Sequence, residues 1–123
     1  MILTNNEIYN YATGLIAEFG PDCNIKLPVK INFFLQKNIK LLTEMAQDID
    51  NSRMEIARQY GVLNENGTSY IVPDNKMEEA CRELNELFAL TQEVNIRTFN
   101  IDDFNNIELS YKQMNALMFM IED

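Results

Sequence analysis

This chain contains closely spaced acidic residues, whose carboxylates could bind a metal ion or take part in acid–base chemistry. Four of them share one short run that is predicted to be helical: Glu78, Glu79, Glu83 and Glu86. Di-metal helical proteins place glutamates in this way, but they complete the site with Glu-x-x-His pairs. The chain contains no histidine, so it cannot supply those pairs. We therefore interpret the four glutamates as a solvent-exposed acidic face that binds a partner.

A second acidic group, Asp102, Asp103 and Glu108, offers the oxygen ligands that Mg²⁺ prefers. A magnesium site that acts on phosphates also needs a glycine-rich cradle and a partner lysine, and neither accompanies these residues. The lack of histidine removes the commonest general base as well. We predict no catalytic residues, no metal and no cofactor, and we treat these carboxylates as further candidates for partner binding. A metal-dependent hydrolase that uses them is the rival enzyme hypothesis.

Composition places the chain among globular proteins with one domain. Its 123 residues are 46% hydrophobic and 24% charged, which is enough for a core of its own. The 19 acidic residues exceed the 10 basic ones and give a net charge of −9, which argues against direct nucleic-acid binding. Most of this charge lies in residues 61–123, which hold twelve acidic and four basic residues. We expect at most weak nucleic-acid binding at the one basic cluster, formed by Lys26, Lys30, Lys37 and Lys40.

The cysteines and the apolar runs indicate the cellular setting. Cys23 and Cys81 belong to no CxxC pair, and they are either two free thiols in a reducing cytoplasm or one disulfide. The longest apolar run, residues 116–121, has six residues, whereas a membrane-spanning helix needs about 20. The first seven residues lack the basic and apolar regions of a signal peptide. We expect a cytoplasmic protein with no membrane partner.

The elements that carry these groups are predicted to be mostly helical. Thr4 and Glu7 fit a capping box at the start of the first helix. Pro28 suits the first turn of a second helix, and neither glycine nor proline interrupts helical geometry between it and Gly61. The predicted elements are helices over residues 4–19 and 28–60, a β-hairpin over 62–72, a helix over 75–91, a strand over 94–99 and a helix over 110–121.

The long second helix carries a heptad pattern that predicts a partner helix along its length. Its members are Leu35, Ile39, Leu42, Ala46, Ile49, Arg53, Ile56 and Tyr60. Arg53 interrupts the pattern, and it either turns out to solvent or marks the point where the helices part or meet a carboxylate. The third helix is patterned in the same way, so we expect the two helices to lie antiparallel. Asn66 and Gly67 between them predict a tight β-turn in which both residues have φ > 0.

The predicted fold class is mostly α with a small β component. A long antiparallel helical hairpin tipped by a β-hairpin forms its centre, and N- and C-terminal helices complete it. We expect this to be a single domain over residues 1–123.

Several short motifs are similar to those of a known protein family. They are LPVKINF at residues 27–33, KNI at 37–39, ARQYG at 57–61, NENG at 64–67, ELNEL at 83–87 and ALMFMIED at 116–123. Together they span about residues 25–123 and resemble a small phage and prophage family, the domain of unknown function numbered 1617. That family has no settled activity and no catalytic residues to carry over. The resemblance implies a phage or prophage origin, in a low-GC Gram-positive host.

These observations favour protein binding over catalysis. The acidic C-terminal half favours an inhibitor of a host defence or nucleic-acid-handling complex, because an acidic surface can occupy a basic nucleic-acid channel. The heptad-patterned hairpin favours the alternative, a virion tail or assembly protein that self-associates or clasps a partner helix. The first hypothesis places the protein in the host cytoplasm, and the second associates it with the virion.

Overall fold

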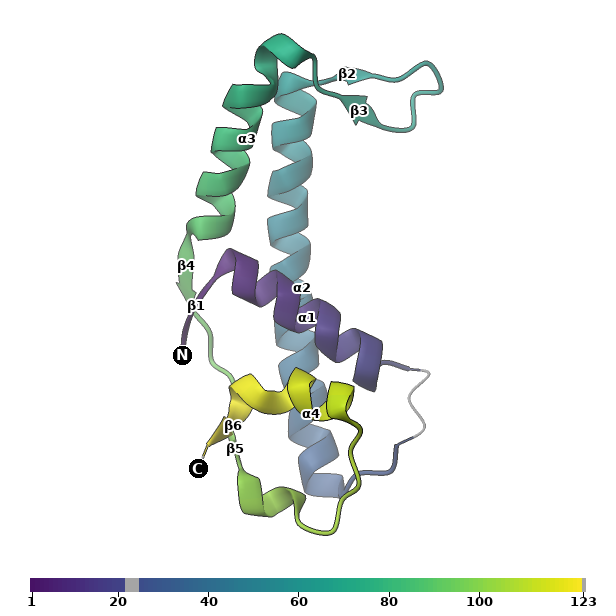
Figure 1. Ribbon diagram of the computed structural model, residues 1–123, viewed down its shortest axis with the longest axis vertical. Coiled ribbons are helices and arrows are strands. Elements are labelled where there is room, and N and C mark those ends of the chain that lie inside the picture. The colour runs from purple at the N-terminus through teal and green to yellow at the C-terminus, as the bar shows by residue number, and fades with distance from the viewer. Residues whose placement is uncertain (22–24, 123) are drawn as a thin grey trace.

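The computed structural model describes residues 1–21 and 25–122, and most of them are helical (Figure 1). The helices are α1 (Asn5–Phe19), α2 (Val29–Tyr60), α3 (Asp74–Ala89) and α4 (Tyr111–Leu117), with 3₁₀ turns η1 (Ile101–Phe104) and η2 (Met118–Met120). The strands are β1 (Ile2–Thr4), β2 (Val62–Leu63), β3 (Tyr70–Ile71), β4 (Thr91–Glu93), β5 (Phe99–Asn100) and β6 (Ile121–Glu122). The predicted fold class, mostly α with a small β component, is confirmed.

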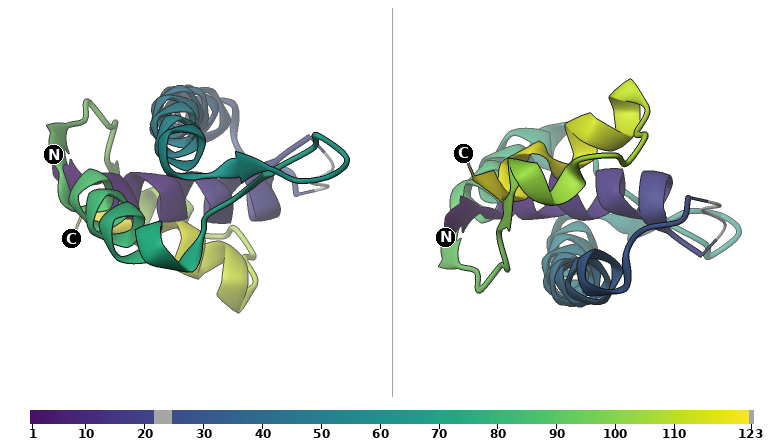
Figure 2. Two further views of the ribbon diagram at one scale, coloured as in Figure 1. Left: turned by 90° about the horizontal axis from the view of Figure 1, so that it is seen from above. Right: turned by 90° about the horizontal axis from the view of Figure 1, so that it is seen from below.

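Helix α1 is the middle layer of the broad lower part of the molecule. It crosses α2 on one side and packs against α4 on the other (Figure 2). Helix α3 runs antiparallel to the C-terminal half of α2, and the β2–β3 hairpin projects from the end that these two helices share (Figure 1). The predicted helical hairpin tipped by a β-hairpin is therefore present.

Local sequence explains where α1 begins, and its apolar face explains the core. Thr4 Oγ1 accepts a hydrogen bond from Glu7 N at 3.0 Å, and Thr4 N donates to Glu7 Oε1 at 3.0 Å, as in a capping box. The residues buried where α1, α2 and the C-terminal segment meet include Ile8, Leu15, Leu35, Leu42, Leu117 and Met120. Burial of each such side chain contributes about 1.5–3 kcal/mol, so the lower part of the molecule holds most of the apolar stabilisation.

The heptad pattern of α2 is buried over only part of its length. Leu35, Leu42 and Ile49 are buried, whereas Ile56 and Tyr60 nearer the C-terminal end are partly exposed. The heptad pattern of α2 therefore extends past the part of the helix that packs in the core.

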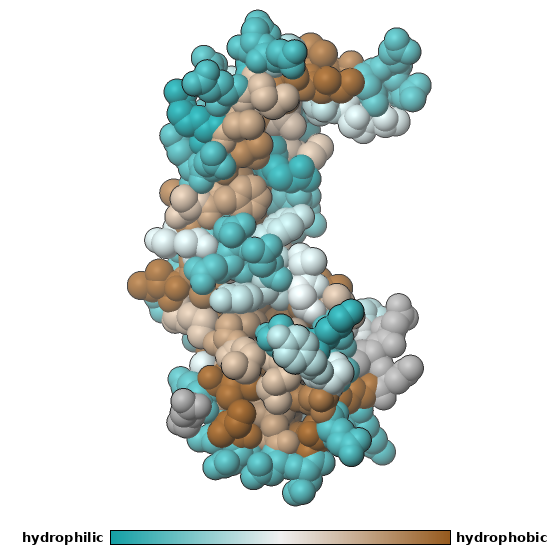
Figure 3. Space-filling model, in the orientation of Figure 1, coloured by the Kyte–Doolittle hydropathy of each residue, from teal (hydrophilic) through white to brown (hydrophobic). Residues whose placement is uncertain are grey.

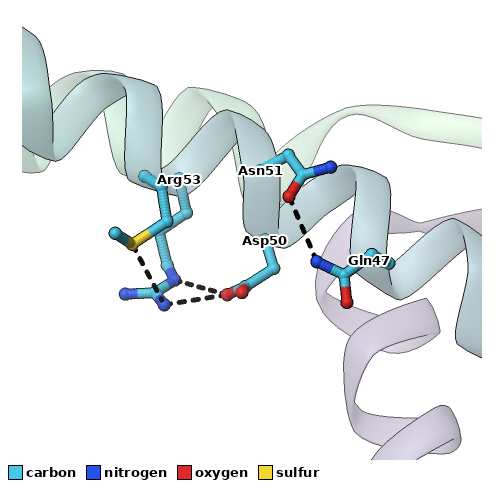
Figure 4. Close-up of polar contacts among 5 residues, drawn as sticks. Gln47, Asp50, Asn51 and Arg53 are labelled. Carbon is cyan, nitrogen blue, oxygen red and sulfur yellow. Dashed lines mark hydrogen bonds and ion pairs between the residues drawn. The ribbon is translucent and has the colours of Figure 1, made fainter.

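Arg53, the polar member of this pattern, turns out to solvent. Its guanidinium contacts Asp50 Oδ1 of the same helix at 2.8 Å (Figure 4). One turn away, Gln47 Nε2 donates a hydrogen bond to Asn51 Oδ1 at 3.1 Å. Of the alternatives for Arg53, the structure shows the outward position, with a carboxylate supplied by its own helix.

Three predicted elements differ from the structure. The strand predicted over residues 94–99 is wrong, because residues 94–98 form no strand; β4 precedes them and β5 follows. The helix predicted over 75–91 ends at Ala89, and Thr91 already belongs to β4. The helix predicted over 110–121 gives way to η2 and then β6. In each case pairing with another strand explains the difference from the prediction. Strand β4 pairs antiparallel with β1, and β5 pairs parallel with β6.

The β-hairpin predicted over residues 62–72 forms, but its strands pair over only two residues each. The predicted turn is wrong, because Gly67 has a φ of 67° whereas Asn66 is not in the left-handed region. Gly67 N instead donates to Asn64 O at 3.0 Å, and Asn64 Oδ1 accepts from Thr68 N at 2.9 Å. The Asn64 side chain thus organises a longer loop that needs one left-handed residue.

Candidate protein-interaction surface

The upper part of the molecule is an arm with almost no core. We define the arm as residues 50–86, which comprise the C-terminal end of α2, the β-hairpin and most of α3. Ala80 is the only buried residue in this range. A segment with so few buried contacts belongs to the least stable part of a protein, where binding elements are commonly found.

Large apolar side chains are exposed at the end of the arm. Val62, Leu63 and Ile71 of the hairpin are 59%, 56% and 58% exposed, and we call them the apolar tip. Because Val62 pairs with Ile71 across the strands, Leu63 lies on the opposite face of the hairpin. Apolar surface is visible at this end of the molecule and along the strip between α2 and α3 (Figure 3). Exposed apolar surface on both faces of this projecting hairpin is available to a partner protein.

The four glutamates predicted to form an acidic face do share α3. Glu78, Glu79 and Glu86 are exposed, and Glu83 is half-buried. The ion pairs of the described residues lie elsewhere, so no basic nitrogen of those residues is within 4.0 Å of these carboxylates. These carboxylates are therefore not held in ion pairs, and on a helix with more acidic than basic residues they can attract a basic partner.

Glu83 also influences the ionisation of Tyr60 of α2. Burial raises the pKa of the Tyr60 phenol, and hydrogen bonding and charge from Glu83 raise it further, as does the charge of Glu79. Arg82 acts in the opposite direction. Glu83 therefore lies near Tyr60 of α2, whereas the other three glutamates are exposed and can meet a partner.

The second group of predicted site residues lies at the opposite end of the molecule, near β5 (Figure 1). Asp103 Oδ2 accepts a hydrogen bond from Asn100 N at 3.0 Å, and Asn100 Oδ1 accepts one from Asp102 N at 3.0 Å, so the side chains of Asn100 and Asp103 form a capping box at η1. Glu108 is exposed in the loop that follows η1. The seven candidate residues therefore form two separate surfaces. Across residues 1–21 and 25–122, no three His, Cys, Asp or Glu side chains are placed to hold a metal ion.

Three lysines of the predicted cluster are divided between two hollows, and the fourth, Lys26, is exposed. Lys37 and Lys40 line one groove together with Arg97, whereas Lys30 lines another hollow beside Asp103. Arg97 was not among the predicted residues, because it is far from the lysines along the chain. Asn38 was the available signal, since it is a polar residue on the buried face of α2 and therefore needs a hydrogen-bonding partner.

Cys81 is an exposed free thiol on α3, and Cys23 lies outside the described residues. Comparison with protein-family models, with curated proteins and with solved structures finds no match for this chain. The similarity to the phage family therefore stays a prediction. Among the described helices, none combines the length and the apolar character needed to cross a membrane.

Proposed function

We propose that this chain is a protein-binding protein that acts through its arm. The observation that carries this proposal is that Ala80 is the only buried residue between residues 50 and 86, while the apolar tip is exposed. A two-stranded hairpin is marginally stable by itself, and exposed apolar side chains on it favour contact with another protein. Seating the tip in a partner would remove this apolar surface from water.

The charge of α3 indicates the kind of partner. Its exposed glutamates lie on the helix that follows the hairpin, and none of them forms an ion pair with a described residue. A partner surface with apolar pockets and a basic rim complements this arrangement, whereas a second copy of a chain with a net charge of −9 would bring like charges together. We infer that the partner is a host defence or nucleic-acid-handling complex, which the arm inhibits by occupying a basic channel in the host cytoplasm.

A second function is favoured by the shape of the arm. The hairpin projects beyond the packed part of the molecule, as a clasp for a structural partner would (Figure 1). The alternative is therefore a virion assembly or tail protein of a phage. It predicts that the protein is found in purified virions, whereas the inhibitor is absent from them.

A pull-down with three forms of the tagged protein tests the proposal. The first is the wild type, the second carries Glu78→Gln, Glu79→Gln and Glu86→Gln, and the third is a control. That control carries the same change of charge at the other acidic surface, through Asp102→Asn, Asp103→Asn and Glu108→Gln. The proteins are expressed in infected host cells, and captured proteins are identified by mass spectrometry.

We expect the wild type and the control to capture the same nucleic-acid-handling complex, and the α3 variant to lose it. Raised salt should weaken the capture, because exposed charges are screened. Equal capture by all three forms would contradict the role of α3. Capture of tail or baseplate proteins by the three forms would favour the assembly function.

A further inference from the structure

A groove of about 700 Å³ lies between α2 and the irregular segment of residues 95–98, away from the arm. Three cations line it, together with apolar side chains: Lys37, Lys40 and Arg97, and Phe34, Leu41 and Ile96. The chain has only 10 basic residues against 19 acidic ones. The groove is therefore locally basic, although the molecule as a whole is acidic.

Arg97 is held in place at both its backbone and its side chain. Asn38 Nδ2 donates a hydrogen bond to Arg97 O at 2.9 Å, and Arg97 N donates to Asn38 Oδ1 at 3.0 Å. The guanidinium carbon lies 4.3 Å from the centre of the Phe34 ring, close enough for a cation–π contact. A cation fixed in this way loses little conformational entropy when it binds a ligand.

On the α2 side of the groove, an aromatic ring also contacts a second cation, Lys37. Lys37 Nζ lies 5.1 Å from the centre of the Phe33 ring, and the Phe33 and Phe34 rings meet edge to face at 5.3 Å. Two neighbouring aromatic rings of α2 thus each carry a cation. Lys40 follows Lys37 by one turn and lines the same groove.

These cations are available to a ligand. No carboxylate oxygen of residues 1–21 and 25–122 lies within 4.0 Å of the charged groups of Lys37, Lys40 or Arg97. Glu44 is the only acidic residue that lines the groove. A guanidinium that stacks on a ring through its face keeps its N–H edge for an oxyanion, which it can hold through two hydrogen bonds.

We propose that this groove binds a small organic molecule that carries a phosphate monoester. The phosphate lies between Arg97 and the two lysines, and the organic part packs against Leu41 and Ile96. Three cations and one carboxylate suit a dianion. A nucleic acid would extend from the groove over a protein of net charge −9, whereas a small ligand meets only the local positive field.

Titration of the full chain by ¹H–¹⁵N NMR tests this site, with phenyl phosphate as the probe and inorganic phosphate as the probe without a ring. Ionic strength is held constant. We expect saturable shifts of the amides around residues 37–41 and 95–98. Phenyl phosphate should bind about tenfold more tightly than inorganic phosphate, because burial of several ring carbons contributes more than 1 kcal/mol.

Variants then separate the site from general charge attraction. Arg97→Gln and Lys37→Gln should each weaken phenyl phosphate binding by about tenfold, the effect of losing one charged hydrogen bond. Lys76→Gln, on exposed α3, makes the same change of charge away from the groove and should leave binding unchanged. Lys37 is an exposed helical residue, so its variant also tests the site if the Arg97 variant folds poorly.

Four results would overturn the proposal. They are shifts that do not saturate, equal weakening by Lys76→Gln and Arg97→Gln, equal affinity for the two phosphates, and tighter binding of a single-stranded oligonucleotide than of phenyl phosphate. The last of these would instead indicate a polyanion site.

Discussion

Asn38 and Arg97 are joined by two hydrogen bonds although 59 residues separate them along the chain. The Asn38 side chain is a buried polar group, and the backbone N–H and C=O of Arg97 satisfy its amide. This contact fixes residues 94–98 to α2, although the segment has no regular secondary structure of its own.

The first prediction concerns the strength of this contact. Asn38→Ala removes both hydrogen bonds and leaves two backbone groups without their partner. We expect the free energy of unfolding to fall by about 2–3 kcal/mol, the cost of polar groups left unsatisfied. Urea denaturation followed by circular dichroism measures this change. Asn32→Ala, at an exposed position of the same helix, is the matched control and should change stability by less than about 0.5 kcal/mol. An equal loss in both variants would show that the contact contributes nothing specific.

The second prediction compares the core with the apolar tip. Leu42 is fully buried, so Leu42→Ala should lower the free energy of unfolding by about 2–5 kcal/mol. Leu63 is 56% exposed, so Leu63→Ala should change it by less than about 0.5 kcal/mol. Denaturant titration of both variants measures the difference. If Leu63→Ala proved as costly as Leu42→Ala, the tip would belong to the core of the free protein and would be a poor candidate for binding.

Signals confined to a few residues allowed much of the fold to be predicted. The Thr4–Glu7 capping box forms as expected, because both partners lie within one helical turn. Ser110 likewise accepts a hydrogen bond from Gln113 N at 3.1 Å and begins the last helix. Such contacts form wherever the local chain is helical, so the sequence alone indicates them.

Contacts between distant segments account for what could not be predicted. Strand β4 forms because it pairs with β1, and Leu3 lies opposite Gln92 in this pair. A strand of three residues is too short to show an alternating hydrophobic pattern, so the sequence did not indicate it. The acidic character of α3 was readable from the sequence, but the distance between α3 and η1 depends on the tertiary fold. The hydrogen bond between Asn38 and Arg97 brings Arg97 to the groove that Lys37 also lines, and this contact too depends on the tertiary fold.

The third prediction concerns two glycines in opposite settings. A Cβ atom at Gly61 would lie 2.6 Å from Ala57 O and 3.0 Å from Tyr70 Cβ, so Gly61→Ala must move the hairpin relative to α2. A Cβ atom at Gly14, inside α1, would meet no atom within 4 Å. Gly14→Ala should therefore stabilise the protein by roughly 0.5–1 kcal/mol through helix propensity, while Gly61→Ala destabilises the arm.

Thermal unfolding and amide hydrogen exchange measure these two effects. Gly14→Ala should raise the melting temperature, and Gly61→Ala should speed exchange at the end of α2 and in the hairpin. Slower exchange in the hairpin of Gly61→Ala would contradict the close approach seen between Gly61 and Tyr70.

The fourth prediction concerns alkaline pH. Burial, and secondarily the charge and hydrogen bonding of Glu7, raise the pKa of Tyr11; burial and Glu83 act in the same way on Tyr60. The folded protein therefore favours the neutral phenols. Their contribution is fully present below the pKa of an unfolded tyrosine, about 10, and is lost as pH rises through the higher pKa of the folded state.

The free energy of unfolding should consequently fall as pH rises above about 10. The double variant Tyr11→Phe and Tyr60→Phe removes both phenols and should reduce this slope, as measured by urea denaturation at a series of pH values. Tyr111→Phe is the control, because the Tyr111 side chain is 82% exposed and its loss should leave the slope unchanged. A double variant that kept the full slope would show that neither the Glu7–Tyr11 nor the Glu83–Tyr60 contact links folding to tyrosine ionisation. A reduced slope would instead show that at least one of the two phenols links folding to tyrosine ionisation, and the single variants Tyr11→Phe and Tyr60→Phe would then assign the effect to α1 or to the arm.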